Sequence, residues 1–317
     1  MNATAPLDTQ FDGRLAPILL FSHMQKVGGT RFGHNVMDLI VPPREQVNHC
    51  HIRSLFEGRE NVNWMLSIWF SGLIKEIHSM VKYSAEDCYF VWDHADWSLK
   101  KALDVGFPLR PEVRYVALVR SPLTIGVSDH FYRHRQSYDY AKKEWPAQVT
   151  DKILEATSSK RNYGKLKKWL SGCSNQKIKC GSIGMPKLID AALCDHSHHV
   201  CRSESAQLKT AEAAIDTAFM IGLTEAMDSA ICLLYKLLYA PIDTGKACSD
   251  LFQDTTDRTN ETPPYKHLLT PQIQAAIRES VHPDDTALYD RAKAKFITQC
   301  HDFNVPIPDT LLVDSSP

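Results

Sequence analysis

Hydrophobic residues in this chain gather in short runs that alternate with segments of helical spacing. Apolar runs at 16–24, 113–120 and 217–223, and the first part of 88–97, predict buried strands. The run at 113–120 is continuous and β-rich, which is typical of a strand covered on both faces of a sheet. Strands that alternate with helices predict an α/β fold with a mostly parallel sheet flanked by helices.

Helical spacing follows most of these runs. Helices are predicted in 30–40, 126–143, 149–172, 224–240 and, as one or two terminal helices, 270–300. Thr224 is the expected N-cap of its helix, and Pro271 lies near a helix start. Residues 173–210 are expected to be loop-rich. The predicted organisation is a flexible segment at 1–15, a single domain at 16–302 and a tail at 303–317.

The composition and charge of the chain disfavour some classes of protein function. The 317 residues are 44% hydrophobic and 23% charged, as in an ordinary globular protein, and the net charge is −1. Without a basic field the chain is not expected to bind nucleic acid. No apolar run approaches the roughly 20 residues that cross a bilayer. The N-terminus has no signal-peptide core, so the protein is either untargeted and soluble or preceded by an anchor.

Polar residues follow three of the predicted strands where each strand ends. They are Lys26–Thr30, His94–Trp97 and Arg120–Ser128. The carboxyl ends of parallel strands share one edge of a sheet, where ligands bind. The sequence therefore predicts that these three groups converge.

Each group suits a particular chemistry. Gly28 and Gly29 can present backbone N–H groups to an anion, Arg120 can form paired hydrogen bonds with a phosphate, and His94 can act as a general base. Taken singly, each has an ordinary alternative, namely a glycine turn, a structural ion pair and a hydrogen-bonded turn histidine. Together they predict a ligand with two phosphates and a proton to remove. Because the order G-x-x-x-x-G-K-[ST] is absent, an ATP-dependent P-loop enzyme is disfavoured.

Cysteines cluster in one stretch of the chain. Four of the nine fall within 173–201, close to three histidines: Cys173, Cys180, Cys194, Cys201, His196, His198 and His199. Zinc is one interpretation, although no C-x-x-C pair is present. Disulfides are favoured over free buried thiols, and free thiols over zinc.

The glycine segment and several later segments resemble the motifs of one known protein family. HMQKVGGTRFGHNV (23–36) resembles the 5′-phosphosulfate loop H-I-Q-K-T-G-G-T-T-F-G of the heparan sulfate 6-O-sulfotransferases, which are Golgi carbohydrate sulfotransferases. Four later segments are similar to that family's motifs in the same order: HADW (94–97), VRYVALVRSPLTIGVSDHFYRHRQ (113–136), TAFMIGLTE (217–225) and ALYDRAKAKF (287–296). NETPPYK (260–266) lies where the family has N-S-T-R.

The resemblance implies a co-substrate and roles for named residues. The co-substrate is 3′-phosphoadenosine 5′-phosphosulfate (PAPS), and no metal is implied. Its 5′-phosphate is expected at Lys26, Val27, Gly28, Gly29, Thr30 and Arg31, with Lys26 at the bridging oxygen. The 3′-phosphate is expected at Arg120 and Ser128, under a loop that contains Thr262. His94 is the expected general base, and the acceptor is expected near Asp96, Trp97, His130 and Arg135. Core packing is the alternative for Trp97.

The expected activity is transfer of the sulfuryl group from PAPS to a hydroxyl of a carbohydrate, with 6-O-sulfation of a heparan-sulfate-like glycan as the best single prediction. The alternatives are an acceptor that is a small molecule or a protein tyrosine, and a non-catalytic protein that binds nucleotide or glycan. The family implies the Golgi lumen or membrane, and a soluble cytoplasmic protein is the alternative. It also implies a Cys173–Cys194 disulfide and glycosylation at Asn260.

The chain departs from the family pattern at four positions: Arg31, Ser121, Ile125 and Pro263. The family has threonine, aspartate, arginine and arginine there. These changes are expected to affect the identity of the acceptor more than the binding of PAPS.

Overall fold

The structure is a computed structural model of the chain. It describes residues 18–24, 27–29, 31–33, 90–93, 97, 113–133, 155, 164–174, 194–196, 198–239, 248 and 271–313. The strands in these residues are β1 (Ile18–His23), β2 (Phe90–Asp93), β3 (Val113–Val119) and β4 (Met220–Leu223). The helices are α4 (Pro122–Arg133), α6 (Lys165–Leu170), α8 (Glu204–Thr217), the 3₁₀ turn η3 (Thr224–Ala226), α9 (Met227–Tyr239), α10 (Pro271–Ser280), α11 (Pro283–Asp302) and α12 (Asp309–Val313).

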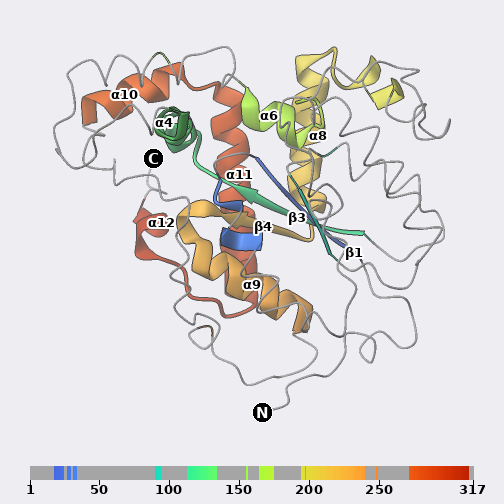
Figure 1. Cartoon of the computed structure of the whole chain (residues 1–317), viewed down its shortest axis with the longest axis vertical. Coiled ribbons are helices and arrows are strands. Elements are labelled where there is room, and N and C mark those ends of the chain that lie inside the picture. The colour runs from blue at the N-terminus through green and yellow to red at the C-terminus, as the bar shows by residue number, and fades with distance from the viewer. Residues whose placement is uncertain are drawn as a thin grey trace. The chain divides into compact units, whose positions relative to one another are not determined.

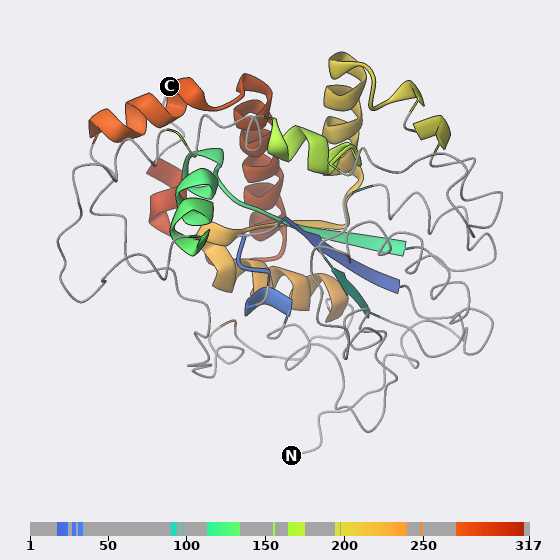
Figure 2. The ribbon, with the colours of Figure 1, turned by 45° about the horizontal axis from the view of Figure 1, so that its top comes forward.

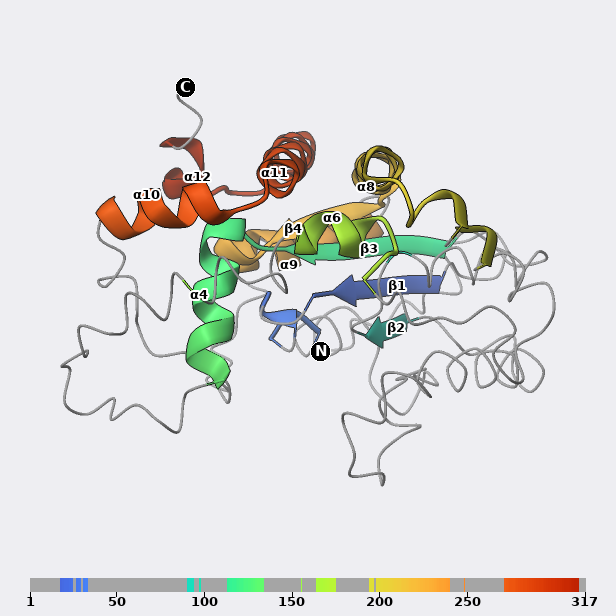
Figure 3. The same ribbon diagram turned by 90° about the horizontal axis from the view of Figure 1, so that it is seen from above.

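The strands form one sheet in the order β2-β1-β3-β4. β1 and β2 are parallel, with Leu19 opposite Phe90 and Ser22 opposite Asp93. The arrows of β1, β2 and β3 point the same way in Figure 3. The predicted α/β class with a parallel sheet flanked by helices is confirmed at this level, and the four predicted strands all exist.

The chain divides into two compact units, and the division cuts β3 after Ala117 and β4 after Ile221. The first unit consists of Met1–Met24, Phe32–Ala117 and Lys168–Ile221. The second consists of Gln25–Arg31, Leu118–Lys167 and Gly222–Pro317. The glycine loop and the corner between β3 and α4 therefore belong to the same unit.

In the first unit, β3 provides much of the core. Tyr115, Val116 and Ala117 are at most 1% exposed, as expected of a strand covered on both faces. The indole ring of Trp97 meets the ring of Tyr115 edge-on, with centroids 4.3 Å apart. The backbone N–H of Trp97 donates to the carbonyl of Trp169 at 3.3 Å.

In the second unit, α11 packs against α4 and α9, and α10 packs against α4 (Figure 1). Side chains at the start of α11 also form hydrogen bonds with the first residues of α6. The carboxylate of Asp285 accepts hydrogen bonds from the backbone N–H groups of Leu166 (3.3 Å) and Lys167 (2.8 Å). The ammonium of Lys167, which is almost fully buried, donates to Asp284 at 2.8 Å. Burial raises the pKa of Asp285, against the lowering effect of these two backbone hydrogen bonds.

The prediction that 173–210 is loop-rich is wrong in its last part, because α8 begins at Glu204. The hydroxyl of Ser203 caps this helix by accepting from the N–H of Ala206. Four alanines within α8 favour the helix further. Since α8 continues to Thr217, β4 begins at Met220 and not at 217 as predicted.

Two predicted helix starts are also corrected. The helix predicted from residue 126 begins at Pro122, which is a residue well suited to a first helical turn. Thr224 is not an N-cap, because it opens the 3₁₀ turn η3 and α9 begins at Met227. The prediction of one or two helices in 270–300 is confirmed, and there are two, α10 and α11, with Pro271 at the start of α10.

Candidate functional site

The glycine loop has the backbone arrangement that the sequence predicts. Val27 and Gly28 follow β1, and helical geometry begins at Gly29; Figure 2 shows this short helical turn in blue, directly after β1. Gly28 has a φ of 76°, a conformation that side-chain-bearing residues rarely adopt. Val27 is fully buried, so the loop is anchored by a core side chain. Lys26 and Thr30 lie outside the described residues.

The corner between β3 and α4 is organised by hydrogen bonds. The guanidinium of Arg120 donates from Nε to the hydroxyl of Thr124 at 3.0 Å. That hydroxyl donates to the carbonyl of Ser121 at 3.1 Å. The N–H of Ser121 donates to Glu225 Oε1 at 2.9 Å. These contacts fix the backbone from which Arg120 extends.

A small cavity of about 20 Å³ lies beside this corner, within the second unit. Its lining consists of Arg120, Pro122, Ile125, Gly126, Lys165, Leu166, Val281 and Asp285. A cavity of this size has room for about one water molecule. A phosphate group, with its four oxygens, is larger, so it would have to meet Arg120 outside this cavity.

A single segment of the second unit contacts both the glycine loop and the β3–α4 corner. The hydroxyl of Thr224 lies 2.6 Å from the carbonyl oxygen of Val27 and 3.1 Å from that of Val119. Asp228 forms an ion pair with Arg31 at 3.0 Å, with both side chains more than half exposed. Of the three groups predicted to converge, the glycine loop and the β3–α4 corner therefore both contact residues 224–228. Of the third group, His94–Trp97, only Trp97 is described, and it belongs to the first unit, so the full convergence stays a prediction. Thr224 and Glu225 end the segment TAFMIGLTE that resembles the family, but the sequence assigned no binding or positioning role to them.

The other candidate residues have different outcomes. Ser128 is 1% exposed, so its hydroxyl is covered by the rest of the chain. Trp97 is also buried, and its contact with Tyr115 is the core packing that was the alternative to an acceptor-binding role. His130 lies on α4, but its side chain is not among those described. His94, Asp96, Arg135, Asn260 and Thr262 lie outside the described residues.

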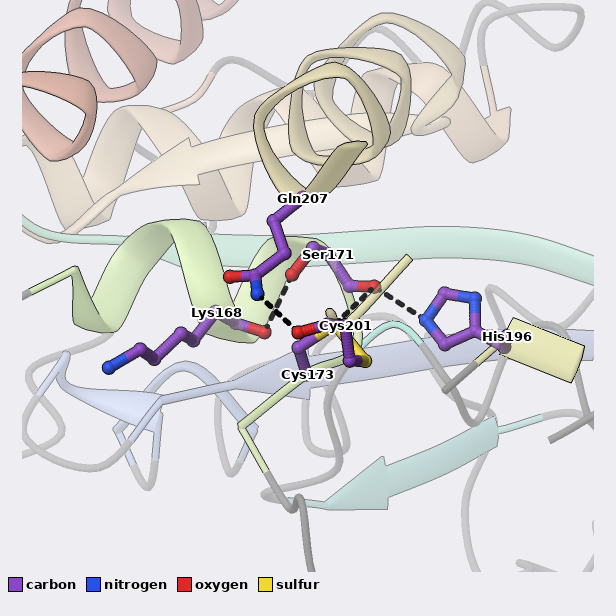
Figure 4. Close-up of a disulfide and its surroundings, with 6 residues drawn as sticks. All are labelled: Lys168, Ser171, Cys173, His196, Cys201 and Gln207. Atoms are coloured by element: carbon purple, nitrogen blue, oxygen red, sulfur yellow. Dashed lines mark hydrogen bonds between the residues drawn. A yellow bond between two sulfur atoms is a disulfide. The ribbon is translucent and has the colours of Figure 1, made fainter. Parts of the chain in front are cut away.

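The predicted Cys173–Cys194 disulfide is wrong, because Cys173 is bonded to Cys201 (Figure 4). The reason is the position of Cys201, two residues before the N-cap of α8. The side-chain amide of Gln207, on the second turn of α8, donates to the carbonyl of Cys201 at 2.8 Å. This contact holds Cys201 against the end of α6, where its Cα lies 5.4 Å from that of Cys173. Cys194 is also disulfide-bonded, to a partner outside the described residues.

His196 lies beside this disulfide, and its ring nitrogen Nε2 is 2.7 Å from the carbonyl oxygen of Ser171. The ligand atoms of Cys173, Cys201 and His196 lie within 4.8 Å of one another. A disulfide offers no thiolate, and the thiolate is the form of cysteine that binds metals. A disulfide therefore accounts for this cluster, in agreement with the interpretation favoured from the sequence. His198 and His199 are exposed, and His199 pairs with Asp195 at 3.0 Å.

Comparison with known proteins adds no family assignment. The chain matches no protein-family model and no curated protein sequence. The functional interpretation therefore rests on the motifs and on the geometry described above. Within the described residues, no helix is both long enough and apolar enough to cross a membrane.

Proposed function

We propose that this protein is a PAPS-dependent sulfotransferase with a P-loop-like α/β fold of the sulfotransferase type. One observation carries the proposal. The carbonyl oxygens of Val27, in the glycine loop, and Val119, at the end of β3, lie 2.6 and 3.1 Å from the Thr224 hydroxyl. The glycine loop and the end of β3 are the two segments in which the sequence predicts sites for the two phosphates of PAPS, and their proximity is what a bisphosphate requires.

The proposed reaction is a direct transfer. The oxygen of the acceptor hydroxyl attacks the sulfur of PAPS, and the bond between sulfur and the bridging phosphate oxygen breaks. The sulfuryl group becomes a sulfate ester, 3′,5′-ADP leaves with the bonding electrons, and His94 takes the proton of the hydroxyl. The loop N–H groups and Lys26 would stabilise the charge that develops on the leaving phosphate. In-line positioning and charge stabilisation supply most of the catalysis in such transfers.

The proposed acceptor is a carbohydrate hydroxyl, with the 6-hydroxyl of a heparan-sulfate-like glycan as the first candidate. His130 and Arg135 are the proposed contacts for acidic groups of the glycan. The proposed compartment is the Golgi lumen. The disulfides Cys173–Cys201 and Cys232–Cys248 support this assignment, because disulfides persist mainly in oxidising compartments.

The first test is a thermal-shift experiment with 3′,5′-ADP, ADP and ATP with magnesium. A ligand that binds only the folded state stabilises it by about 2.7 kcal/mol at a hundredfold excess over its dissociation constant. We expect a clear rise of Tm with 3′,5′-ADP and a smaller one with ADP. A rise of Tm with ATP and magnesium but none with 3′,5′-ADP would contradict the proposal and favour a nucleoside triphosphatase.

The second test measures the chemistry. Transfer of radiolabelled sulfate from PAPS is followed with desulfated heparan sulfate, small phenols and a tyrosine peptide as acceptors. We expect His94→Ala to abolish transfer while 3′,5′-ADP still binds. Loss of nucleotide binding in that variant would remove His94 from the role of base. Binding of 3′,5′-ADP by the wild type without transfer to any acceptor would favour a non-catalytic protein.

A further inference from the structure

We infer that Thr224 is a positioning residue that fixes the spacing between the two phosphate subsites of the proposed PAPS site. The inference rests on the proposed function. It concerns residues 224–228, which we call the brace, and every contact it uses lies within the second unit. Thr224 itself is not proposed to touch the ligand.

The Thr224 hydroxyl is shared by two carbonyl groups from distant parts of the chain. Val27 belongs to the glycine loop and Val119 is the last residue of β3, and their carbonyl oxygens lie 2.6 and 3.1 Å from Thr224 Oγ1. A hydroxyl has one proton, so the nearer carbonyl of Val27 receives the stronger hydrogen bond. The same oxygen nevertheless sets the distance between both segments.

Two further residues of the brace also help to fix the glycine loop and the end of β3. Glu225 accepts the N–H of Ser121 at 2.9 Å, which fixes the residue directly after Arg120. Met227 packs against Gly28, because a Cβ on that glycine would lie only 2.7 Å from Met227 Cε. The exposed pair of Asp228 with Arg31 adds little, since solvent screens ion pairs at the surface.

The brace is anchored in the core by buried residues within it and directly before it. It follows β4 without a break, and the four residues of β4 are all buried. Ala226 and Met227 are buried as well. A movement of the glycine loop relative to the end of β3 would therefore have to break contacts with a fixed segment of the core.

This arrangement has a consequence for ligand selectivity. Two binding groups held at a fixed spacing give a ligand that carries both phosphates an advantage over ligands that carry one. Loosening the spacing removes that advantage, because ordering of the two subsites must then accompany binding. The brace should therefore matter most for 3′,5′-ADP and least for 5′-AMP or 3′-AMP.

The experiment compares the wild type with Thr224→Val, which keeps the shape of the side chain and removes the hydroxyl. Thr298→Val is the matched control, because the hydroxyl of Thr298 bonds only within α11, to the carbonyl of Ala294 at 3.0 Å.

Isothermal titration calorimetry measures the dissociation constants of 3′,5′-ADP, 5′-AMP and 3′-AMP for each protein. We expect Thr224→Val to weaken the binding of 3′,5′-ADP about tenfold, because the substitution removes one hydrogen bond and leaves a buried carbonyl without its donor. The two monophosphates should weaken less than about threefold, Thr298→Val should change nothing, and Thr224→Ser should restore binding.

Equal weakening of all three ligands, or no weakening of 3′,5′-ADP, would overturn the inference. Hydrogen exchange without ligand provides a second readout. In Thr224→Val the amides of 28–29 and 120–121 should exchange faster together, and in Thr298→Val they should not. Unchanged exchange at both segments would overturn the inference by itself. If the wild type binds none of the three nucleotides, the proposed function fails, and the exchange result still decides whether Thr224 couples the two segments.

Discussion

Gly28 lies directly against Met227, since a Cβ built on the glycine would be 2.7 Å from Met227 Cε and 3.6 Å from Thr224 Cγ2. Two physical reasons thus require glycine at this position. The φ of 76° is strained for any residue with a side chain, and the space for a methyl group is occupied. The methionine terminus is flexible and can move, so the backbone conformation is the larger of the two effects.

Alanine at Gly28 should therefore lower the free energy of unfolding by about 1–2 kcal/mol, the strain expected for a left-handed alanine. Gly164→Ala is the matched control. Gly164 has a φ of 66°, but its nearest non-local atom is a comfortable 3.5 Å away. Urea unfolding should show similar losses for the two variants, whereas only Gly28→Ala should weaken binding of 3′,5′-ADP. Equal effects on binding would mean that the loop has no special role.

The Cys173–Cys201 disulfide closes a longer loop than Cys232–Cys248, with sequence separations of 28 and 16 residues. Chain entropy predicts that removing the first destabilises the protein by about 3.5 kcal/mol and the second by about 3 kcal/mol. Unfolding of the two double-serine variants tests this order. Mass spectrometry of non-reduced peptides should find Cys173 linked to Cys201, and a Cys173–Cys194 peptide would contradict the structure.

The free thiols of the protein should be few and slow to react. Cys173, Cys201, Cys232, Cys248 and Cys194 with its partner make up six of the nine cysteines. Titration of denatured, unreduced protein should therefore find at most three thiols. Cys300 is buried and free, and burial raises the pKa of its thiol to about 12. It should resist alkylation in the native state at pH 8 and react after denaturation. A count of nine would contradict the disulfides.

Asp285 should make the stability depend on pH in a direction opposite to that of a carboxylate whose pKa is lowered by hydrogen bonds or an ion pair in the folded state. Burial raises its pKa in the folded state above the ordinary 3.8, so the folded state binds the proton more tightly than the unfolded state does. Its contribution to stability is then fully present below pH 3.8 and is lost as the pH rises through the raised pKa. Asp285→Asn removes this titration.

The measurement is urea unfolding of both proteins from pH 3.5 to 8, with Asp302→Asn at the exposed end of the same helix as control. The wild type should lose stability relative to Asp285→Asn as the pH rises, and the difference should then level off. A gain relative to the variant would mean that the hydrogen bonds from Leu166 and Lys167 outweigh the effect of burial.

The periodicity of hydrophobic residues was sufficient to predict those helices and strands whose buried residues follow a regular pattern. The run 113–120 predicted β3 because it is mostly apolar and rich in valine, and the structure has the strand at Val113–Val119. The weakly apolar helix α8 was missed, since its alanines give little amphipathic contrast and its Ser203 cap was not recognised. The start of the strand predicted from 217 was wrong for the same reason, since α8 continues to Thr217.

The α/β class, the four strands to within a few residues and the glycine turn were thus predictable from the sequence, because they depend on local periodicity and on backbone preferences of single residues. The partner of Cys173 and the contacts of the Thr224 hydroxyl were not predictable in this way. Both depend on segments that are distant in the chain and are brought together by the burial of β4 and the placement of α8. Contacts of this kind are set by the packing of the whole core, and no local pattern encodes them.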